Sequence, residues 1–209
     1  MKEIKNIFCI GRNYAKHAKE LGNEVLTSPI LFSKPTHSLV KADGEYITFP
    51  ADRGNIHYEL EIVLYIEKDI PVEFEVEDVV KNMALGIDFT LRDEQTTLKE
   101  NGHPWLKAKG FRNSAVLTDF WEFPGEEICS NSNFSLIING STVQLGNTKD
   151  MIFNFKQIIE ECNHYFGLSK GDIIYTGTPE GVGSIKNKDE FKLLWGDEEK
   201  GRFTVVKEK

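Results

Sequence analysis

The sequence predicts an α+β protein rich in β-strands, built on a mostly antiparallel or mixed sheet. Residues 57–66 (HYELEIVLYI) alternate apolar and other side chains, which is the period of a strand. Residues 134–138 and 141–145 flank Asn139-Gly140, a pair that tolerates positive φ and indicates a two-residue hairpin. Strand-like segments outnumber helical ones and do not alternate with them regularly, which disfavours a doubly wound sheet.

The remaining elements follow from the same periodicities. In residues 57–66 the positions expected to face the core are Tyr58, Leu60, Ile62, Leu64 and Ile66. The pattern predicts further strands at 171–176, 189–195 and 202–207. It predicts a helix over 154–166, where apolar residues recur at helical spacing, and shorter helices at 13–21, 76–82 and 92–101, the first with Asn13 as its N-cap.

Composition narrows the function classes. The chain has 209 residues, with 25 Lys and Arg against 33 Asp and Glu, a net charge of −8. The sequence contains no repeat or linker-like stretch, so we expect a single domain over 1–209. The acidic balance disfavours a nucleic-acid partner, because phosphate neutralisation needs clustered basic residues. The remaining partner class is a small molecule.

Hydropathy and cysteine content bear on location. No apolar run approaches the length needed to cross a membrane, so no membrane partner is expected. The three cysteines, Cys9, Cys129 and Cys162, are odd in number and widely spaced, which argues against a disulfide framework or a thiolate zinc site. These features favour a reducing, cytoplasmic setting.

One candidate site is a group of acidic residues. Glu59 and Glu61 lie two apart on the predicted strand, so both side chains point to the same face, about 6.6 Å apart along the strand. Asp88 follows a second short strand predicted to end at Ile87 and can supply a third oxygen ligand. Three carboxylates suit Mg²⁺ or Mn²⁺ rather than zinc. The alternative is an ordinary solvated strand face.

A second candidate is His17 with Glu20. On a helix these two residues lie three apart on one face, so the carboxylate can hold one imidazole nitrogen while the other accepts a proton. The alternative is a surface histidine that lies near a glutamate by chance.

Other candidates are weaker on their own. Residues 172–183 run from a strand into a glycine-rich turn, whose amides and Thr178 hydroxyl can cradle an anion, although a purely structural turn is the favoured interpretation of this motif taken alone. Lys34 and Lys109 are candidate partners for an anionic substrate or for the acidic ligands, or are simply solvated.

Taken together, six short motifs occur in a fixed order: GRNYxxHxxE, FxKP, HxExE, DxTxRDxQ, KxF and GTPxGVG. This ordered set resembles the fumarylacetoacetate hydrolase family, most closely its short acylpyruvate hydrolase and oxaloacetate decarboxylase branch. The resemblance runs from about Phe8 to the C-terminus. It implies a mixed-sheet β-roll of the type found in the C-terminal domain of that family, and a homodimer.

The resemblance also implies roles for individual residues. It implies Mg²⁺ or Mn²⁺ bound by Glu59, Glu61 and Asp88, and a general-base dyad of His17 and Glu20. The positions that match the family's substrate and metal pocket are Gln95, Lys109 and Thr178, with Arg12 as a further candidate for binding substrate.

The function expected from this resemblance is metal-dependent hydrolysis of a C–C bond in acylpyruvates through a pyruvate enolate bound to the metal. Because the same enolate serves related reactions, the alternatives are an oxaloacetate decarboxylase or tautomerase, or a 2-hydroxydienoate isomerase of aromatic-acid breakdown. Each of these enzymes takes a small 2-oxo acid or its enol. A non-catalytic metal-binding protein is a further alternative, although it would need the three carboxylates and not His17 or Glu20.

Overall fold

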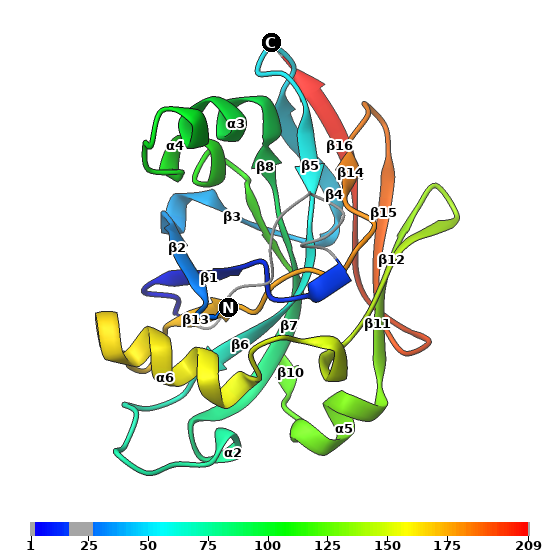
Figure 1. The fold of residues 1–209 in the computed structure, drawn as a ribbon. Helices are drawn as coiled ribbons and strands as arrows, with labels where there is room; N and C mark the ends of the chain where they lie inside the picture. Colours follow the sequence, from blue (N-terminus) through cyan, green and yellow to red (C-terminus); the bar gives the residue numbers. More distant parts are fainter. Residues whose placement is uncertain (1–2, 17–26, 209) are drawn as a thin grey trace.

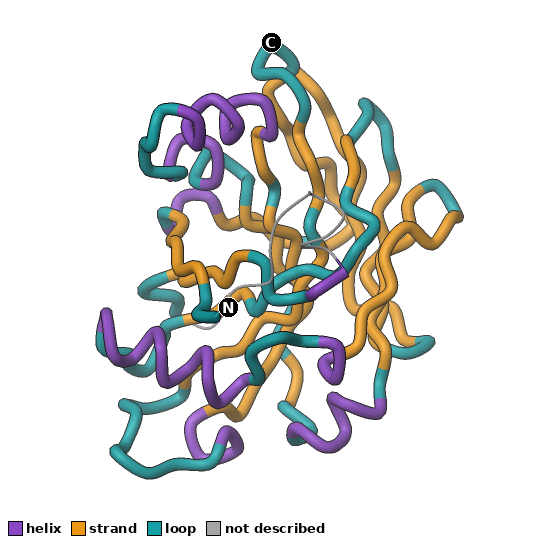
Figure 2. The backbone as a smooth tube through the Cα atoms, viewed as in Figure 1, coloured by secondary structure: helices purple, strands orange, loops and turns teal. Residues whose placement is uncertain are grey.

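The computed structural model describes residues 3–16 and 27–208 of the chain. Within these ranges β-strands dominate, and short helices lie at the margins of the sheets (Figures 1 and 2). The strands form three sheets, which together confirm the β-rich α+β class expected from the sequence.

The largest sheet is mixed. Its pairs β1–β13 and β3–β9 are parallel, and its other pairs are antiparallel. In spatial order its strands are β2 (Ile30–Lys34), β1 (Ile7–Gly11), β13 (Ile173–Tyr175), β6 (Leu60–Ile66), β7 (Val80–Asp88), β9 (Ala115–Leu117) and β3 (Leu39–Lys41), with β10 (Trp121–Glu122) paired to β7.

Two smaller sheets complete the fold. The five-stranded sheet contains β12 (Ser141–Asn147), β11 (Asn133–Ile138), β15 (Glu190–Trp195), β16 (Glu198–Glu208) and β4 (Asp43–Pro50) in that order. The three-stranded sheet contains β14 (Gly183–Ser184), β5 (Ile56–Tyr58) and β8 (Thr90–Leu91). The predicted hairpin is confirmed between β11 and β12, where Asn139 and Gly140 both have positive φ, 51° and 81°.

The helices are short except for one. They are α2 (Val76–Val79), α3 (Arg92–Glu100), α4 (Leu106–Lys109), α5 (Glu126–Asn131) and α6 (Phe155–Phe166), with 3₁₀ turns η1 (Thr36–Ser38) and η2 (Thr148–Asp150). The predicted helices over 154–166 and 92–101 are confirmed as α6 and α3. Helix α6 begins at a capping box, in which Asn154 accepts from the Gln157 amide and the Gln157 side chain accepts from the Asn154 amide.

Three sequence expectations change in the structure. The predicted strand at 57–66 is divided at Glu59 into β5 and β6, which lie in different sheets. The predicted helix at 76–82 is wrong beyond Val79, because Val80 pairs with Ile66 and the chain continues as β7. Asn13 is not a helix cap, since its side chain bonds the distant backbone of Phe153 and Thr176. Most of the predicted helix at 13–21 lies outside the described residues.

Strand β6 shows how the large sheet is covered. Leu60, Ile62 and Leu64 belong to the main hydrophobic core, whereas Val63 and Tyr65 belong to a second core on the opposite face. All seven residues of β6 are therefore buried. The solvated strand face that the sequence left open as an alternative is not present on β6. The acidic residues at its beginning are enclosed by the same packing.

Two further expectations concern the cysteines and the membrane. Cys9, Cys129 and Cys162 are all free and buried, and Cys9 packs in the second core. None of the described helices combines the length and the apolar character that a membrane crossing requires.

Candidate functional site

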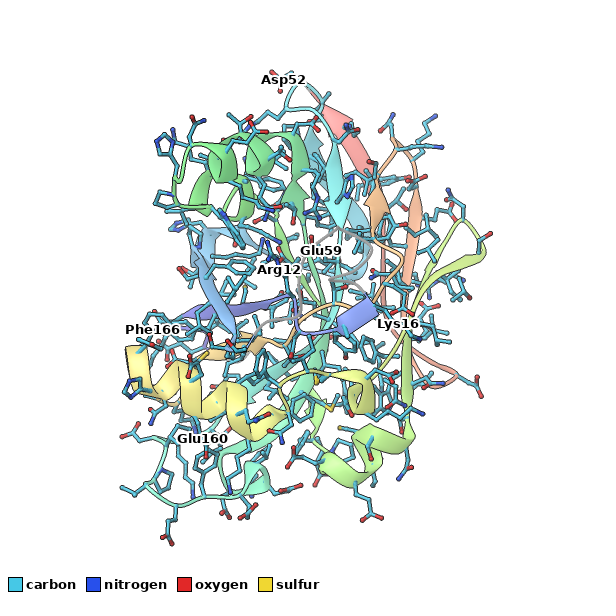
Figure 3. The ribbon with its side chains drawn as sticks, viewed as in Figure 1. Arg12, Lys16, Asp52, Glu59, Glu160 and Phe166 are labelled. Carbon is cyan, nitrogen blue, oxygen red and sulfur yellow. The ribbon has the colours of Figure 1, made fainter. Side chains whose placement is uncertain are left out.

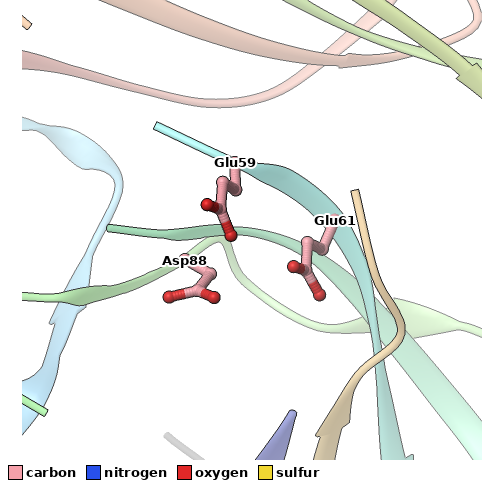
Figure 4. Close-up of side chains that lie close together, drawn as sticks. All are labelled: Glu59, Glu61 and Asp88. Atoms are coloured by element: carbon pink, nitrogen blue, oxygen red, sulfur yellow. The ribbon is translucent and has the colours of Figure 1, made fainter. Parts of the chain in front are cut away.

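Three acidic side chains converge where strands β6 and β7 meet (Figure 4). The antiparallel register places Leu60 opposite Ile87 and Glu61 opposite Gly86, and the Asp88 amide donates a 2.8 Å hydrogen bond to the Glu59 carbonyl. One carboxylate oxygen each from Glu59, Glu61 and Asp88 lie within 4.8 Å of one another. Their side chains are buried, with residue exposures of 6%, 2% and 0%. The strand pairing therefore assembles the three-carboxylate cluster predicted from the sequence.

Two buried lysines contact this cluster. Lys109 Nζ lies 2.8 Å from Glu59 Oε2 and 2.6 Å from Asp88 Oδ2. Lys34 Nζ lies 2.7 Å from Asp88 Oδ1 and also donates to the carbonyls of Phe89, Lys109 and Ser114. Both lysines, considered from the sequence as partners for acidic ligands, are thus paired with them rather than solvated.

Arg92 links the cluster to helix α3. One guanidinium nitrogen lies 2.5 Å from Glu59 Oε1, and another donates to Gln95 Oε1 over 2.7 Å. The Thr90 hydroxyl donates to the same Glu59 oxygen over 3.1 Å. Sequence reasoning missed the role of Arg92. The available signal was its position three residues before Gln95, which places both on one helical face.

The glycine-rich turn after β13 closes another side of the cluster. The Gly177 amide donates to Glu61 Oε2 over 2.7 Å. Gly177 has φ of 102°, and a Cβ there would lie 2.6 Å from Asn13 Cβ, so only glycine fits. Thr178 is buried and accepts from Gln144 Nε2 over 2.9 Å. The turn therefore does line the acidic site, as the anion-cradle hypothesis requires.

Gln144 is a second residue that sequence reasoning missed. It lies on β12 in the five-stranded sheet, yet its Oε1 accepts from the Leu60 amide over 2.9 Å, between the two glutamates. Its Nε2 donates to Thr178 and to the Pro179 carbonyl. Nothing local to β12 marks this residue, apart from a glutamine at a position where the strand alternation expects burial.

The charges of the cluster shift one another's pKa. Burial raises the pKa of Glu61 well above its usual value, and the charges of Asp88 and Glu59 raise it further. Burial also raises the pKa of Asp88, against the lowering effect of Lys109 and Lys34. Burial alone would lower the pKa of Lys109, but Asp88 and Glu59 outweigh it and raise that pKa. Buried carboxylates in this state gain from a nearby divalent cation.

The donor set fits such a cation. Asp88 Oδ1 is buried and has no hydrogen-bond donor in the described part of the chain, although Lys34 Nζ is close to it. An oxygen in this state has a free lone pair, and three carboxylates in one group suit Mg²⁺ or Mn²⁺. The residues that would hold the ion are Glu59, Glu61 and Asp88.

A small cavity of about 40 Å³ opens beside the cluster. Figure 3 shows Arg12 and Glu59 near the centre of the molecule, and both line this cavity. Its other lining residues are Ile10, Gly11, Phe32, Glu61, Asp88, Arg92, Gln95, Lys99, Trp105, Lys109 and Thr178. Arg12, Gln95, Lys109 and Thr178, separate in the sequence, are thus brought together with the three acidic residues. His17 and Glu20 lie outside the described residues.

Comparison with known proteins identifies the relatives of this chain. Residues 6–204 match the profile of the family described as fumarylacetoacetate (FAA) hydrolase C-terminal. The chain belongs to the fumarylacetoacetate hydrolase family. This confirms the resemblance seen in the six sequence motifs, and the mixed, curled sheet is the fold expected for the family.

Two curated relatives of this chain are both named as oxaloacetate tautomerases. The chain is 38% identical over 197 residues to oxaloacetate tautomerase YcgM of Escherichia coli K12, covering 92% of this chain and 89% of that protein. It is 40% identical over 193 residues to the human mitochondrial oxaloacetate tautomerase FAHD1, covering 90% and 86%.

A solved structure similar to this chain belongs to an enzyme with a different activity. Fumarylpyruvate hydrolase of Pseudomonas aeruginosa, in complex with Mn²⁺ and pyruvate, superposes with a TM-score of 0.88 at 31% identity, covering 99% of this chain and 91% of the other. Members similar to this chain therefore include both tautomerases and a hydrolase of related 2-oxo acids.

Proposed function

We propose that this protein is a divalent-metal-dependent enzyme that interconverts the enol and keto forms of oxaloacetate. The observation that carries the proposal is the buried group of Glu59, Glu61 and Asp88, which faces one cavity together with cationic and amide side chains. The curated relatives named as oxaloacetate tautomerases favour this reaction over the acylpyruvate hydrolysis expected first from the sequence.

The three carboxylates would hold Mg²⁺ or Mn²⁺. When bound, the cation would polarise the 2-oxo group and favour negative charge on its oxygen. Lys109, Gln95 and Thr178 line the same cavity, so a substrate bound there would lie among them. Because the carboxylates of Asp88 and Glu59 raise the pKa of Lys109, this side chain stays protonated at neutral pH and supplies positive charge rather than acting as a base.

The reaction moves one proton. Conversion of the enol to the keto form adds a proton at C3 and removes the proton of the C2 hydroxyl, so the composition of the substrate is unchanged. We assign the proton transfer at C3 to His17, oriented by Glu20, following the family resemblance. Thr178 and Arg12 are assigned to binding of substrate carboxylate groups.

The second candidate is hydrolysis of an acylpyruvate. The fumarylpyruvate hydrolase structure supports it, because that protein holds Mn²⁺ and pyruvate on a fold that superposes closely on this chain. In this reaction His17 would take a proton from water, which attacks the distal carbonyl, and C–C cleavage would release a carboxylic acid and pyruvate.

One set of assays separates these reactions. The loss of the ultraviolet absorbance of enol-oxaloacetate reports tautomerisation, and pyruvate formation from oxaloacetate and from acetylpyruvate reports decarboxylation and hydrolysis. Each assay is run with Mg²⁺, with Mn²⁺ and with a chelator, and is corrected for the reaction without protein. Metal-dependent enol loss with little pyruvate supports the tautomerase. Rapid pyruvate release from acetylpyruvate would move the assignment to the hydrolase, and release from oxaloacetate to the decarboxylase.

A variant tests the proton-transfer role. His17→Ala should slow enol loss by about 100-fold or more, which is typical of removing a general base. The affinity for Mn²⁺ should stay unchanged, because His17 is not assigned to the metal. A His17→Ala protein with undiminished tautomerase activity would contradict the assignment.

A further inference from the structure

The cavity beside the acidic cluster has a cationic wall that the proton transfer does not use. Lys99 lies on α3, seven residues after Arg92 and four after Gln95. Residues at this spacing share one face of a helix, and all three line the cavity. Along the helix axis the Lys99 backbone lies about 10 Å beyond that of Arg92. Within the described residues Lys99 forms no ion pair with Glu59, Glu61 or Asp88, and Glu59 and Asp88 pair instead with Arg92, Lys109 and Lys34.

The cations of the cavity fall into two groups. Arg92 is paired with Glu59, and Lys109 is paired with both Glu59 and Asp88. Neither Arg12 nor Lys99 forms an ion pair with any carboxylate in residues 3–16 and 27–208. In the described part of the chain, four cationic side chains thus face three carboxylates, and Arg12 and Lys99 are the two that pair with none of the three.

Arg12 and Lys99 lie close enough to influence one another. Burial lowers the pKa of Lys99, and the positive charges of Arg12 and Arg92 lower it further. Burial also lowers the pKa of Arg12. Such mutual repulsion disfavours an empty cavity and is relieved when an anion binds between the cations.

The backbone holds Arg12 at this place. Its φ is 60°, a left-handed conformation that costs a non-glycine residue about 1 kcal/mol or more. The next residue, Asn13, is buried and makes three hydrogen bonds to the backbone of Phe153 and Thr176. These bonds keep Arg12 at the edge of the cavity.

We propose that Lys99, with Arg12, binds the distal carboxylate of a dicarboxylic 2-oxo acid and so makes the cavity selective for dianionic substrates. The inference rests on the proposed function, because it takes the 2-oxo group and the carboxylate next to it to lie at Glu59, Glu61 and Asp88. A monocarboxylic 2-oxo acid leaves the two cations without a counter-ion, whereas oxaloacetate supplies one carboxylate to each end of the cavity.

The test compares two ligands that differ in the distal carboxylate. L-malate and L-lactate are both 2-hydroxy acids, and neither has an enol form to turn over. Isothermal titration calorimetry with Mg²⁺ present gives the two dissociation constants and their ratio. The variants are Lys99→Gln and, as a matched control, Lys107→Gln, which changes an exposed lysine on α4 outside the cavity.

Wild-type protein should bind malate more tightly than lactate. Lys99→Gln should weaken malate binding by about tenfold, the effect of losing one charged contact, and leave lactate binding unchanged. Lys107→Gln should keep the wild-type ratio. The inference is overturned if the wild type shows no preference for malate, if Lys99→Gln retains the preference, or if Lys107→Gln loses as much.

The same variants separate this inference from the proposed function. A malate preference that depends on Lys99, in a protein that does not consume enol-oxaloacetate, supports the distal carboxylate site and rejects the tautomerase. Enol consumption without a Lys99-dependent malate preference supports the tautomerase and rejects the distal site. In the case where both hold, Lys99→Gln should raise the KM for enol-oxaloacetate about tenfold with little change in kcat.

Discussion

The ammonium group of Lys34 lies 2.7 Å from Asp88 Oδ1, and both side chains are almost completely shielded, with exposures of 0% and 1%. Lys34 also donates to three backbone carbonyls around the site. It therefore holds Asp88 and the chain near Lys109 in one arrangement. Within the described residues Lys34 pairs with Asp88 and with no other carboxylate of the cluster, so its role is to position Asp88.

Lys34→Met should lower the free energy of unfolding by about 3–5 kcal/mol, because it removes one of the two buried ammonium partners of Asp88 and leaves three backbone carbonyls without this donor. Urea denaturation measures the change. Lys170→Met is the matched control, since its ion pair with Glu67 has the same 2.7 Å length but lies at the surface, and it should cost at most about 1 kcal/mol. Equal losses in the two variants would contradict the positioning role.

Neutralising a carboxylate of the cluster should weaken metal binding. Glu59→Gln, Glu61→Gln and Asp88→Asn each replace a charged oxygen by a neutral amide, and each should raise the Mn²⁺ dissociation constant by at least about tenfold. Titration calorimetry gives the constants. Glu94→Gln, on α3 and paired with Arg53 outside the cluster, should bind Mn²⁺ like the wild type. Wild-type affinity in all three cluster variants would rule out this metal site.

Glu61 should make the metal-free protein pH-sensitive. Because burial and the charges of Asp88 and Glu59 raise its folded-state pKa, its stabilising contribution is present below its unfolded pKa and is lost as pH rises through the folded pKa. Metal-free Glu61→Gln should therefore gain stability relative to wild type as pH rises above about 4, by about 1.4 kcal/mol for each unit between the two pKa values.

Denaturation in the presence of a chelator at pH 5 and pH 8 measures this difference. Glu160→Gln, an exposed position on α6, is the control and should show no comparable trend. A Glu61→Gln advantage that stays constant or shrinks with rising pH would refute the assignment of Glu61 as a destabilised buried carboxylate.

Gln144 should couple the five-stranded sheet to the site. Gln144→Leu leaves the Leu60 amide without its acceptor and Thr178 without its donor, so the protein should lose about 1–3 kcal/mol of stability. Mn²⁺ binding should weaken as well, because Leu60 lies between two proposed ligands. Thr142→Val, at an exposed position on the same strand, should change neither. Reduced stability with wild-type Mn²⁺ affinity would limit Gln144 to a structural role.

Local sequence patterns predicted the elements whose residues interact with near neighbours. The hairpin at Asn139-Gly140 depends on two residues that accept positive φ, and α6 on apolar spacing and its Asn154 cap. The boundary between α2 and β7 could not be predicted this way. Consecutive valines at 79 and 80 are compatible with a helix and with a strand. The pairing of Val80 with Ile66 of β6 decided that the chain becomes a strand at Val80.

The sequence by itself determined the β-rich class, the shared face of Glu59 and Glu61, and the ordered motifs that mark the family. These depend on short-range geometry, since strand side chains repeat every two residues. Only the tertiary structure decided that Asp88 meets Glu59, that Lys34 and Lys109 are paired with the cluster, and that Gln144 reaches it from another sheet. Those contacts depend on strand register and sheet packing between distant segments, which no local period encodes.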